Sequence, residues 1–408
     1  MSKTNRIVDY LIVGLLILSG GSIPNIFFRN QLTILLFVLL AGAFLLSIRQ
    51  LKRKEFRFLI VSILGVLIAL LVNYYFAIGY QKVVKFGFIF LCFLISFLAV
   101  IRFKIHLSSR RFLEVFRLVL YVVLVHALFN FIAYPFVKGS LTLIEYDFNG
   151  FDCSTFKNIF FFEQSKNEIN FFGLTLCRNQ GFFGEPGILQ IYLNILLFIE
   201  LFVNSIKKKW HISLISVGLL TTYSTTGIAL LLLQLSVYFY RQIRRNIILL
   251  PLLVVIMAPI YQVMKSNVED KVFGDRSSSF TVRMFDLVQP LLIVKEHPVT
   301  GVGLDKETYR ITRSKYSYSS EYFKFDSLEK GSSNSILFML SSAGIPVTMV
   351  LIMGLYRQNL FRHREKLFFV IMMVSLMSEP LLLTPFFLFF IMLGMYNQFQ
   401  DLSWGKTY

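Results

Sequence analysis

The sequence is poor in charged residues. Only 16% of its 408 residues are Asp, Glu, Lys or Arg, whereas a soluble globular chain carries about 25%. At the same time 56% of the residues are hydrophobic, and the mean hydropathy is +0.66. This combination excludes an ordinary soluble domain.

The sequence also lacks the signatures of several common catalytic sites. It has no HExxH or CxxC motif, no Asp-rich loop and no P-loop, so neither a metal site nor direct coupling to ATP is indicated. The two long polar connections between its apolar runs contain a single histidine, His297, which leaves no basis for a Ser-His-Asp triad. We therefore expect no metal and no other cofactor.

The hydrophobic residues that are present come in long runs. Runs of this length predict an all-α polytopic integral membrane protein with about 12 transmembrane helices. The first run lacks a small-residue cleavage site, so it is interpreted as a retained signal anchor. The expected spans lie near residues 7–23, 31–48, 57–78, 83–101, 112–134, 187–205, 210–224, 226–240, 247–264, 334–356, 367–381 and 383–398.

The net charge of +18 is concentrated in a few short connections between these runs. With twelve spans, all of these basic connections fall on the same side as both termini, and the positive-inside rule makes that side cytoplasmic. The charge thus indicates topology, and we expect no nucleic-acid partner. The basic residues lie in the ranges 49–57, 102–111, 207–209, 241–245 and 357–366.

Two of the connections are long, and both are expected on the external side. Long polar insertions of this kind usually carry function. They divide the chain into N-terminal membrane helices, a first external loop, central membrane helices, a large external loop, and C-terminal membrane helices with a short cytoplasmic tail. The corresponding ranges are 1–134, 135–186, 187–264, 265–333 and 334–408.

The first external loop ends in the sequence RNQGFFGEPG, residues 178–187. The Arg178 guanidinium has the fork geometry that suits phosphate oxygens. Glu185 precedes Pro186 at a helix start, where a carboxylate stabilises the N-terminus. The same loop contains Cys153 and Cys177, which an oxidising compartment would allow to pair; two unpaired thiols are an equal alternative.

The second external loop contains Arg276 and Arg283, seven residues apart. On a helix that spacing brings two guanidinium groups to one face, where they would suit a diphosphate; structural ion pairs with neighbouring carboxylates are the alternative. Pro290 is expected to kink or end this helix. Farther along, HPVTGVG begins with His297 and predicts a tight turn.

The order of these motifs resembles the O-antigen polymerase and ligase family (Wzy-like proteins). The similarity covers about residues 178–346, whereas the first five spans match only in hydropathy. The matching positions are Arg178, Gly181, Phe183, Glu185, Pro186 and Gly187, the turn at 223–227, then Arg276, Arg283, His297, Pro298, Gly301 and Gly303, and finally Asn334 and Gly344 of a segment that re-enters the membrane.

The resemblance implies a GT-C-like glycosyltransferase of the bacterial inner membrane that acts on undecaprenyl-diphosphate-linked oligosaccharides. Arg276 and Arg283 would hold the diphosphate and stabilise the leaving group, and Glu185 is a candidate base. Lipid tails would enter from the bilayer, and a chain-length regulator is an expected partner. The expected substrate-binding residues are Arg178, His297, Tyr309 and Asn334.

Three functions remain open at this point. Ligases of the family carry a histidine directly before the asparagine, and this chain has Ser333 before Asn334, which favours a polysaccharide polymerase over a ligase. A flippase or transporter is the third alternative. Such proteins often show two related halves, and the two long loops do not fall at matching positions of two halves.

Overall fold

Helices form most of the chain in the computed structural model, and they divide into two units. The structure describes residues 3–48, 51–106, 109–148, 151–155, 162–164, 168–171, 174–245, 277–316, 332–361 and 364–403. Unit 1 consists of Met1–Val119, Leu287–Ser319 and Asp326–Tyr408, and unit 2 of Leu120–Asp286 and Ser320–Phe325.

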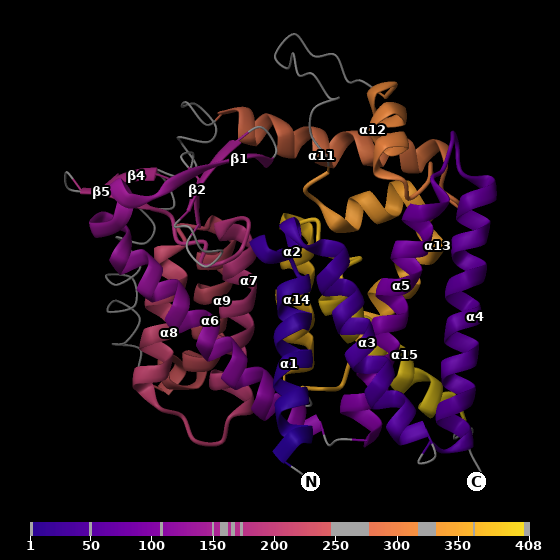
Figure 1. Ribbon diagram of the computed structural model, residues 1–408, viewed down its shortest axis with the longest axis horizontal. Coiled ribbons are helices and arrows are strands. Elements are labelled where there is room, and N and C mark those ends of the chain that lie inside the picture. The colour runs from indigo at the N-terminus through magenta and orange to yellow at the C-terminus, as the bar shows by residue number, and fades with distance from the viewer. Residues whose placement is uncertain are drawn as a thin grey trace. The chain divides into compact units, whose positions relative to one another are not determined.

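Unit 1 is built from long helices that run side by side, with α12 lying beyond the ends of α4 and α5 (Figure 1). Its helices are α1 (Lys3–Ser19), α2 (Ile23–Phe27), α3 (Arg29–Ser47), α4 (Arg53–Phe76), α5 (Val83–Val100), α12 (Lys306–Ser314), α13 (Ser335–Tyr356), α14 (Glu365–Ser378) and α15 (Pro385–Ser403).

Aromatic side chains fill much of the interior of unit 1. Phe58 of α4 packs edge-on against Tyr396 of α15, with ring centroids 5.1 Å apart, and Phe112 packs on Phe389 at 4.9 Å. The backbones of α13 and α15 approach so closely that a Cβ on Gly394 would lie 1.7 Å from the carbonyl oxygen of Gly354. Only glycine fits at such a contact.

Unit 2 contains most of α6 (Ser109–Val137), together with α7 (Pro186–Phe198), α8 (Lys209–Thr221) and α9 (Thr225–Arg245). The helix α11 (Ser277–Glu296) belongs to unit 2 up to Asp286 and to unit 1 beyond it. It continues through Pro290, so the proline does not end the helix, and the alternative expectation of a kink there stays a prediction. Proline has no backbone N–H, so one helical hydrogen bond is missing at this position. Gln289 and Ile293, which flank the proline on the same helix, are fully buried, and their packing compensates for the missing bond.

The connection at residues 135–186 contains short strands that an all-α prediction did not include. The order β1-β2-β3 forms one antiparallel sheet and β4-β5 forms another. Cys153 pairs with Ile144 in the first sheet, and Cys177 pairs with Glu168 in the second. The strands are β1 (Thr142–Phe148), β2 (Phe151–Thr155), β3 (Phe162–Gln164), β4 (Glu168–Phe171) and β5 (Leu174–Cys177).

Six helices of the described chain are long and apolar enough to cross a membrane, so the protein is a multi-pass membrane protein of mainly helical fold. Two shorter apolar helices, Thr225–Tyr240 and Pro385–Phe399, lie where further spans are expected. The expected span at 247–264 lies outside the described residues, and the total of twelve stays a prediction. The six are Arg29–Ser47, Arg53–Phe76, Val83–Lys104, Arg110–Ser140, Pro186–Val203 and Ser335–Tyr356.

Candidate functional site

In unit 2 the segment 178–187 forms the entrance to α7. Pro186 occupies the first helical position, as predicted, where its missing N–H costs nothing. Glu185 is the N-cap residue, and its carbonyl oxygen accepts the first helical hydrogen bonds, from Ile188 N and Leu189 N. Its side chain makes no capping hydrogen bond, so Glu185 orders the helix start through its backbone. A role for its carboxylate as a base stays a prediction.

This entrance is held against the turn between α8 and α9. The backbone N–H of Asn179 donates to the Thr221 carbonyl over 3.0 Å, and its side-chain Nδ2 donates to Thr221 Oγ1 over 2.9 Å. Thr221 directly precedes the turn Thr222–Ser224. Two motifs about forty residues apart, which sequence reasoning did not connect, therefore form one structure.

Arg178 takes part in the same contact. Its Nε donates to the Thr222 carbonyl over 3.3 Å and its Nη2 to the Tyr223 carbonyl over 3.2 Å. Tyr223 adopts a left-handed backbone conformation, with φ of 48°, within the turn that presents these two carbonyls to Arg178. These two hydrogen bonds fix the direction of the guanidinium, and the Arg178 residue is half-buried. Its role in phosphate binding stays a prediction.

Farther along α7, a network of buried side-chain amides joins this helix to α9. Asn194 Nδ2 donates to Gln190 Oε1 over 2.8 Å, and Gln234 Nε2 donates to Asn194 Oδ1 over 2.9 Å. Gly227 allows this approach, because a Cβ there would lie 2.7 Å from Gln190 Cβ. Side-chain amides often join helices inside a membrane. Each of these amides is a lone polar residue within an apolar run, so the sequence alone does not show that they meet.

In unit 1 the turn that follows His297 lies along a break in α13. The break is at Gly344, whose φ of 81° is non-helical. Val302 N and Gly303 N donate over 2.9 Å each to the carbonyls of Ser341 and Ser342. On the far side of the break, Ile345 N donates to the Pro298 carbonyl over 2.8 Å. The turn thus satisfies backbone groups that the broken helix leaves open.

Two amide side chains from the first half of the chain complete this arrangement. Asn73 Nδ2 donates to the carbonyls of Thr300 and Ser342, over 2.9 and 2.8 Å, and Asn73 Oδ1 accepts from Leu304 N over 3.2 Å. Gln81 Oε1 accepts from Asp305 N over 3.1 Å. Neither amide was a candidate in the sequence, because a single polar residue at the end of an apolar run carries no motif.

His297 lies one residue beyond the end of α11. Its carbonyl accepts from Gly301 N over 3.3 Å, which closes the predicted turn. Its Nε2 lies 3.1 Å from the Tyr316 hydroxyl, which donates to Glu296 Oε2 over 2.8 Å. Burial of the Tyr316 hydroxyl, followed by its hydrogen bond to Glu296, raises the pKa of this tyrosine. Tyr316 therefore stays protonated and joins its two partners at neutral pH.

Tyr309 and Asn334 have structural contacts in unit 1. The Tyr309 ring is 2% exposed and packs edge-on against Phe338, while its hydroxyl lies 2.9 Å from Ser341 Oγ. A buried ring has no free face on which a sugar could stack, so the structure gives Tyr309 a packing role. Asn334 caps α13, since its Oδ1 accepts from Ile336 N and Leu337 N.

Arg276 and Arg283, the two arginines expected to bind the diphosphate, are described only in part. Arg276 lies outside the described residues, and Arg283 lies within α11 with its side chain undescribed. A third arginine, which sequence reasoning missed, is Arg313 of α12. It is 1% exposed, and its Nε donates to Gln289 Oε1. An arginine is rarely buried so completely without a specific partner, but only the folded structure reveals that burial.

In the described part of the chain, no three His, Cys, Asp or Glu side chains gather as a metal site would require. The candidate residues thus form two polar assemblies, one in each unit. In unit 1 the Asn73 amide contacts the backbone of the turn after His297, and in unit 2 Arg178 and Asn179 contact the turn between α8 and α9 and the residue before it.

Residues 211–352 match the sequence model of a family described as O-antigen ligase. The match begins in α8 and includes Arg283, His297, Asn334 and Gly344, so the resemblance to the O-antigen polymerase and ligase proteins is confirmed over this part of the chain. No curated protein matches the chain at a significant level. Over this segment, which is less than half of the chain, the protein is similar to the O-antigen ligase family.

Proposed function

We propose that the protein is a polysaccharide polymerase that transfers a growing glycan from undecaprenyl diphosphate to an incoming lipid-linked repeat unit. The observation that carries the proposal is the match of residues 211–352 to the O-antigen ligase family. Arg283, His297 and Asn334, which carry the resemblance in the sequence, lie within this range. Ser333 replaces the histidine that ligases carry before the asparagine, which favours polymerisation. The GT-C-like architecture belongs to this proposal.

In the proposed reaction a hydroxyl oxygen of the incoming repeat forms a bond to the anomeric carbon of the growing chain. The bond from that carbon to the diphosphate oxygen breaks, and undecaprenyl diphosphate leaves. The hydroxyl proton passes to a base, for which Glu185 is the candidate. Arg178, Arg276 and Arg283 would stabilise the negative charge that develops on the leaving diphosphate, an effect worth about 2.7–4 kcal/mol per donor in other enzymes.

The direct test uses Arg276→Ala and Arg283→Ala in the native host, with glycan length as the readout. The proposal predicts single-repeat glycans from variants that remain in the membrane at normal levels. Arg110→Ala is the matched control, because the Arg110 side chain is 89% exposed and lies in a connection expected on the cytoplasmic side. Long chains in both loop variants would remove the arginines from the reaction.

A ligase is the second candidate, because the matched family is described as O-antigen ligase. The two functions differ in what accumulates when the gene is deleted. Loss of a polymerase leaves single repeats, whereas loss of a ligase leaves full-length chains on the lipid carrier. Glycan profiling of the deletion strain therefore separates them.

A further inference from the structure

Three cationic side chains from separate segments of unit 1 gather near one end of its helices. Arg29 is the first residue of α3, and its guanidinium carbon lies 4.2 Å from the centre of the Phe88 ring. Lys85 precedes Phe88 by three residues on α5, and residues at that spacing share a helix face. Arg29 and Lys85 are therefore neighbours across the α3–α5 contact.

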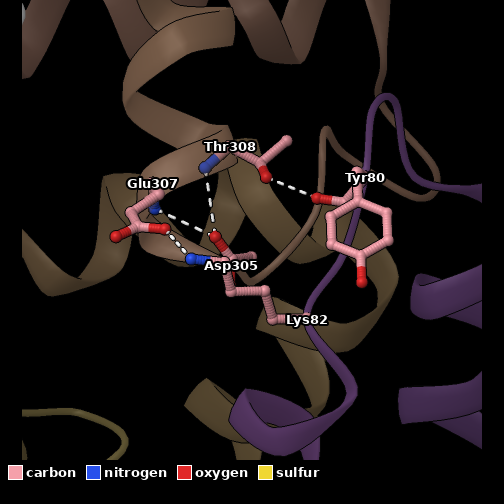
Figure 2. Close-up of polar contacts among 5 residues, drawn as sticks. All are labelled: Tyr80, Lys82, Asp305, Glu307 and Thr308. Atoms are coloured by element: carbon pink, nitrogen blue, oxygen red, sulfur yellow. Dashed lines mark hydrogen bonds and ion pairs between the residues drawn. The ribbon is translucent and has the colours of Figure 1, made fainter.

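The third cation, Lys306, is brought to the same place by α12. Asp305 N donates to Gln81 Oε1. Thr308 Oγ1 donates to the Tyr80 carbonyl over 2.5 Å, and Glu307 forms an ion pair with Lys82 (Figure 2). Lys306 lies between two of these anchored residues. The start of α12 is thus tied to the connection that leads into α5 and Lys85. We call Arg29, Lys85 and Lys306 the α12 cation patch.

The charges around the α12 cation patch do not cancel. Counting Lys82 with the patch gives four positive groups, and Asp305 and Glu307 give two negative ones, so the local balance is four minus two, or a net +2. Glu307 is already paired with Lys82. Asp305 uses Oδ1 to cap α12 through Glu307 N and Thr308 N.

The pKa of Lys306 agrees with a net positive charge at the patch. Desolvation, followed by the positive charges of Arg29 and Lys85, lowers the pKa of Lys306, so these cations are close enough to repel one another. Such repulsion is relieved when an anion binds among them. In the described part of the chain, no carboxylate forms an ion pair with any of the three.

The position of the patch restricts what that anion can be. Arg29 and Lys85 lie in the first turns of two helices that can cross a membrane, which puts the patch at the level of lipid headgroups. Because Asp305 already accepts hydrogen bonds from the α12 N-terminus, recognition of a ligand falls to the three cationic side chains.

We propose that the α12 cation patch binds the phosphate group of a membrane lipid. The Arg29 guanidinium offers two parallel donors to phosphate oxygens, and the two ammonium groups act as point charges. The lipid phosphate comes from the diphosphate of a polyprenyl carrier or from a phospholipid headgroup. The inference goes beyond the proposed transferase function, because lipid binding requires no turnover and is measured without it.

The test is native mass spectrometry of the purified full-length protein with three added lipids: undecaprenyl diphosphate, phosphatidylglycerol, and diacylglycerol, which lacks phosphate. The triple glutamine variant of the patch is compared with a variant carrying Arg57→Gln, Lys295→Gln and Lys315→Gln, three exposed side chains. The control removes the same charge elsewhere in unit 1. We expect about tenfold weaker binding of a phosphate lipid by the patch variant alone, since charge-assisted bonds carry the recognition.

The lipid affected identifies the source of the phosphate. Weakened binding of undecaprenyl diphosphate alone identifies the carrier, weakened binding of phosphatidylglycerol alone identifies the phospholipid headgroup, and weakening of both shows that the shared phosphate is recognised. Unchanged binding of both lipids, or an equal loss in the control, overturns the proposal. Lys85→Gln, a change of one exposed side chain, repeats the measurement if the triple variant does not fold.

Discussion

The side-chain amide of Asn73 donates to the Ser342 carbonyl over 2.8 Å and joins α4 to the residue two before the break in α13. The same nitrogen donates to the Thr300 carbonyl over 2.9 Å. One amide thus holds both the broken helix and the turn that lies along it. Asn73 and Ser342 are both buried, so water cannot replace the hydrogen bond between them if the amide is lost.

Asn73→Ala tests this arrangement. The substitution leaves the Thr300 and Ser342 carbonyls and Leu304 N without their partner, and each unsatisfied buried group costs about 1–3 kcal/mol. We expect a clear fall in the melting temperature of the detergent-purified protein. Asn25→Ala is the control, since the Asn25 amide donates only over 3.4 Å to the Ser19 carbonyl. Equal melting temperatures for both variants would contradict the role assigned to Asn73.

Gly344→Ala tests the break in α13 itself. A Cβ at this position would lie 1.9 Å from the Val299 carbonyl oxygen, and the φ of 81° is unfavourable for any L side chain. We expect a strongly destabilised protein with low membrane yield.

Gly42→Ala provides the comparison for Gly344→Ala. It lies within α3 with nothing inside 4 Å of the added Cβ, so the change should be neutral or stabilise by up to about 1 kcal/mol through helix propensity. Equal melting temperatures for Gly344→Ala and Gly42→Ala would contradict the role assigned to Gly344.

Asp9 and Arg102 form a buried ion pair in unit 1, with Arg102 Nη2 2.9 Å from Asp9 Oδ1. The Asp9 side chain is fully buried, so Asp9→Ala leaves a nearly buried positive charge uncompensated. Changes of this kind cost about 3–5 kcal/mol. The exposed Arg110–Glu114 pair is the control, and Arg110→Ala should change the unfolding free energy by about 0–1 kcal/mol. Chemical unfolding of the two variants in detergent measures the difference.

The ion pair between Lys82 and Glu307 predicts a pH dependence. The hydrogen bond from Lys82, and then its charge, lowers the pKa of Glu307 below its ordinary 4.5, while the same contact raises the pKa of Lys82 above 10.5. The Glu307 contribution to stability is therefore complete above pH 4.5 and is lost as the pH falls through the lowered pKa. The Lys82 contribution is complete below pH 10.5 and is lost as the pH rises through the raised pKa.

Glu307→Gln isolates this contribution. Wild type should melt above the variant at neutral pH, and the difference should disappear in acid and shrink at high salt, because the pair is exposed. A difference that persists in acid would show that Glu307 acts through something other than its charge.

The sequence predicted features that depend on short-range patterns. Apolar runs indicated the membrane helices, and Pro186 marked the start of α7. The sequence did not predict the hairpins between residues 142 and 177, whose strands are only three to seven residues long. It also expected Pro290 to disturb a helix that continues through it, because packing outweighs a local preference.

In the candidate site, too, short motifs were predicted from the sequence, whereas contacts between distant residues were not. The turn at His297 and the glycine at 344 were recognisable from motif order. Asn73 was not, because its partners Thr300 and Ser342 lie 227 and 269 residues away in the sequence. The amide network of Gln190, Asn194 and Gln234 consists of lone polar residues within apolar runs, and only packing shows that they meet.

The most direct test of the proposed function is to reconstitute the purified protein into liposomes with one lipid-linked repeat unit as the only glycan. The repeat unit is isolated from the deletion strain, and the products are separated by length. The account predicts a ladder of two, three and more repeats on the carrier with release of undecaprenyl diphosphate, and none with Arg283→Ala. Single repeats that stay unchanged with the wild-type protein would contradict it.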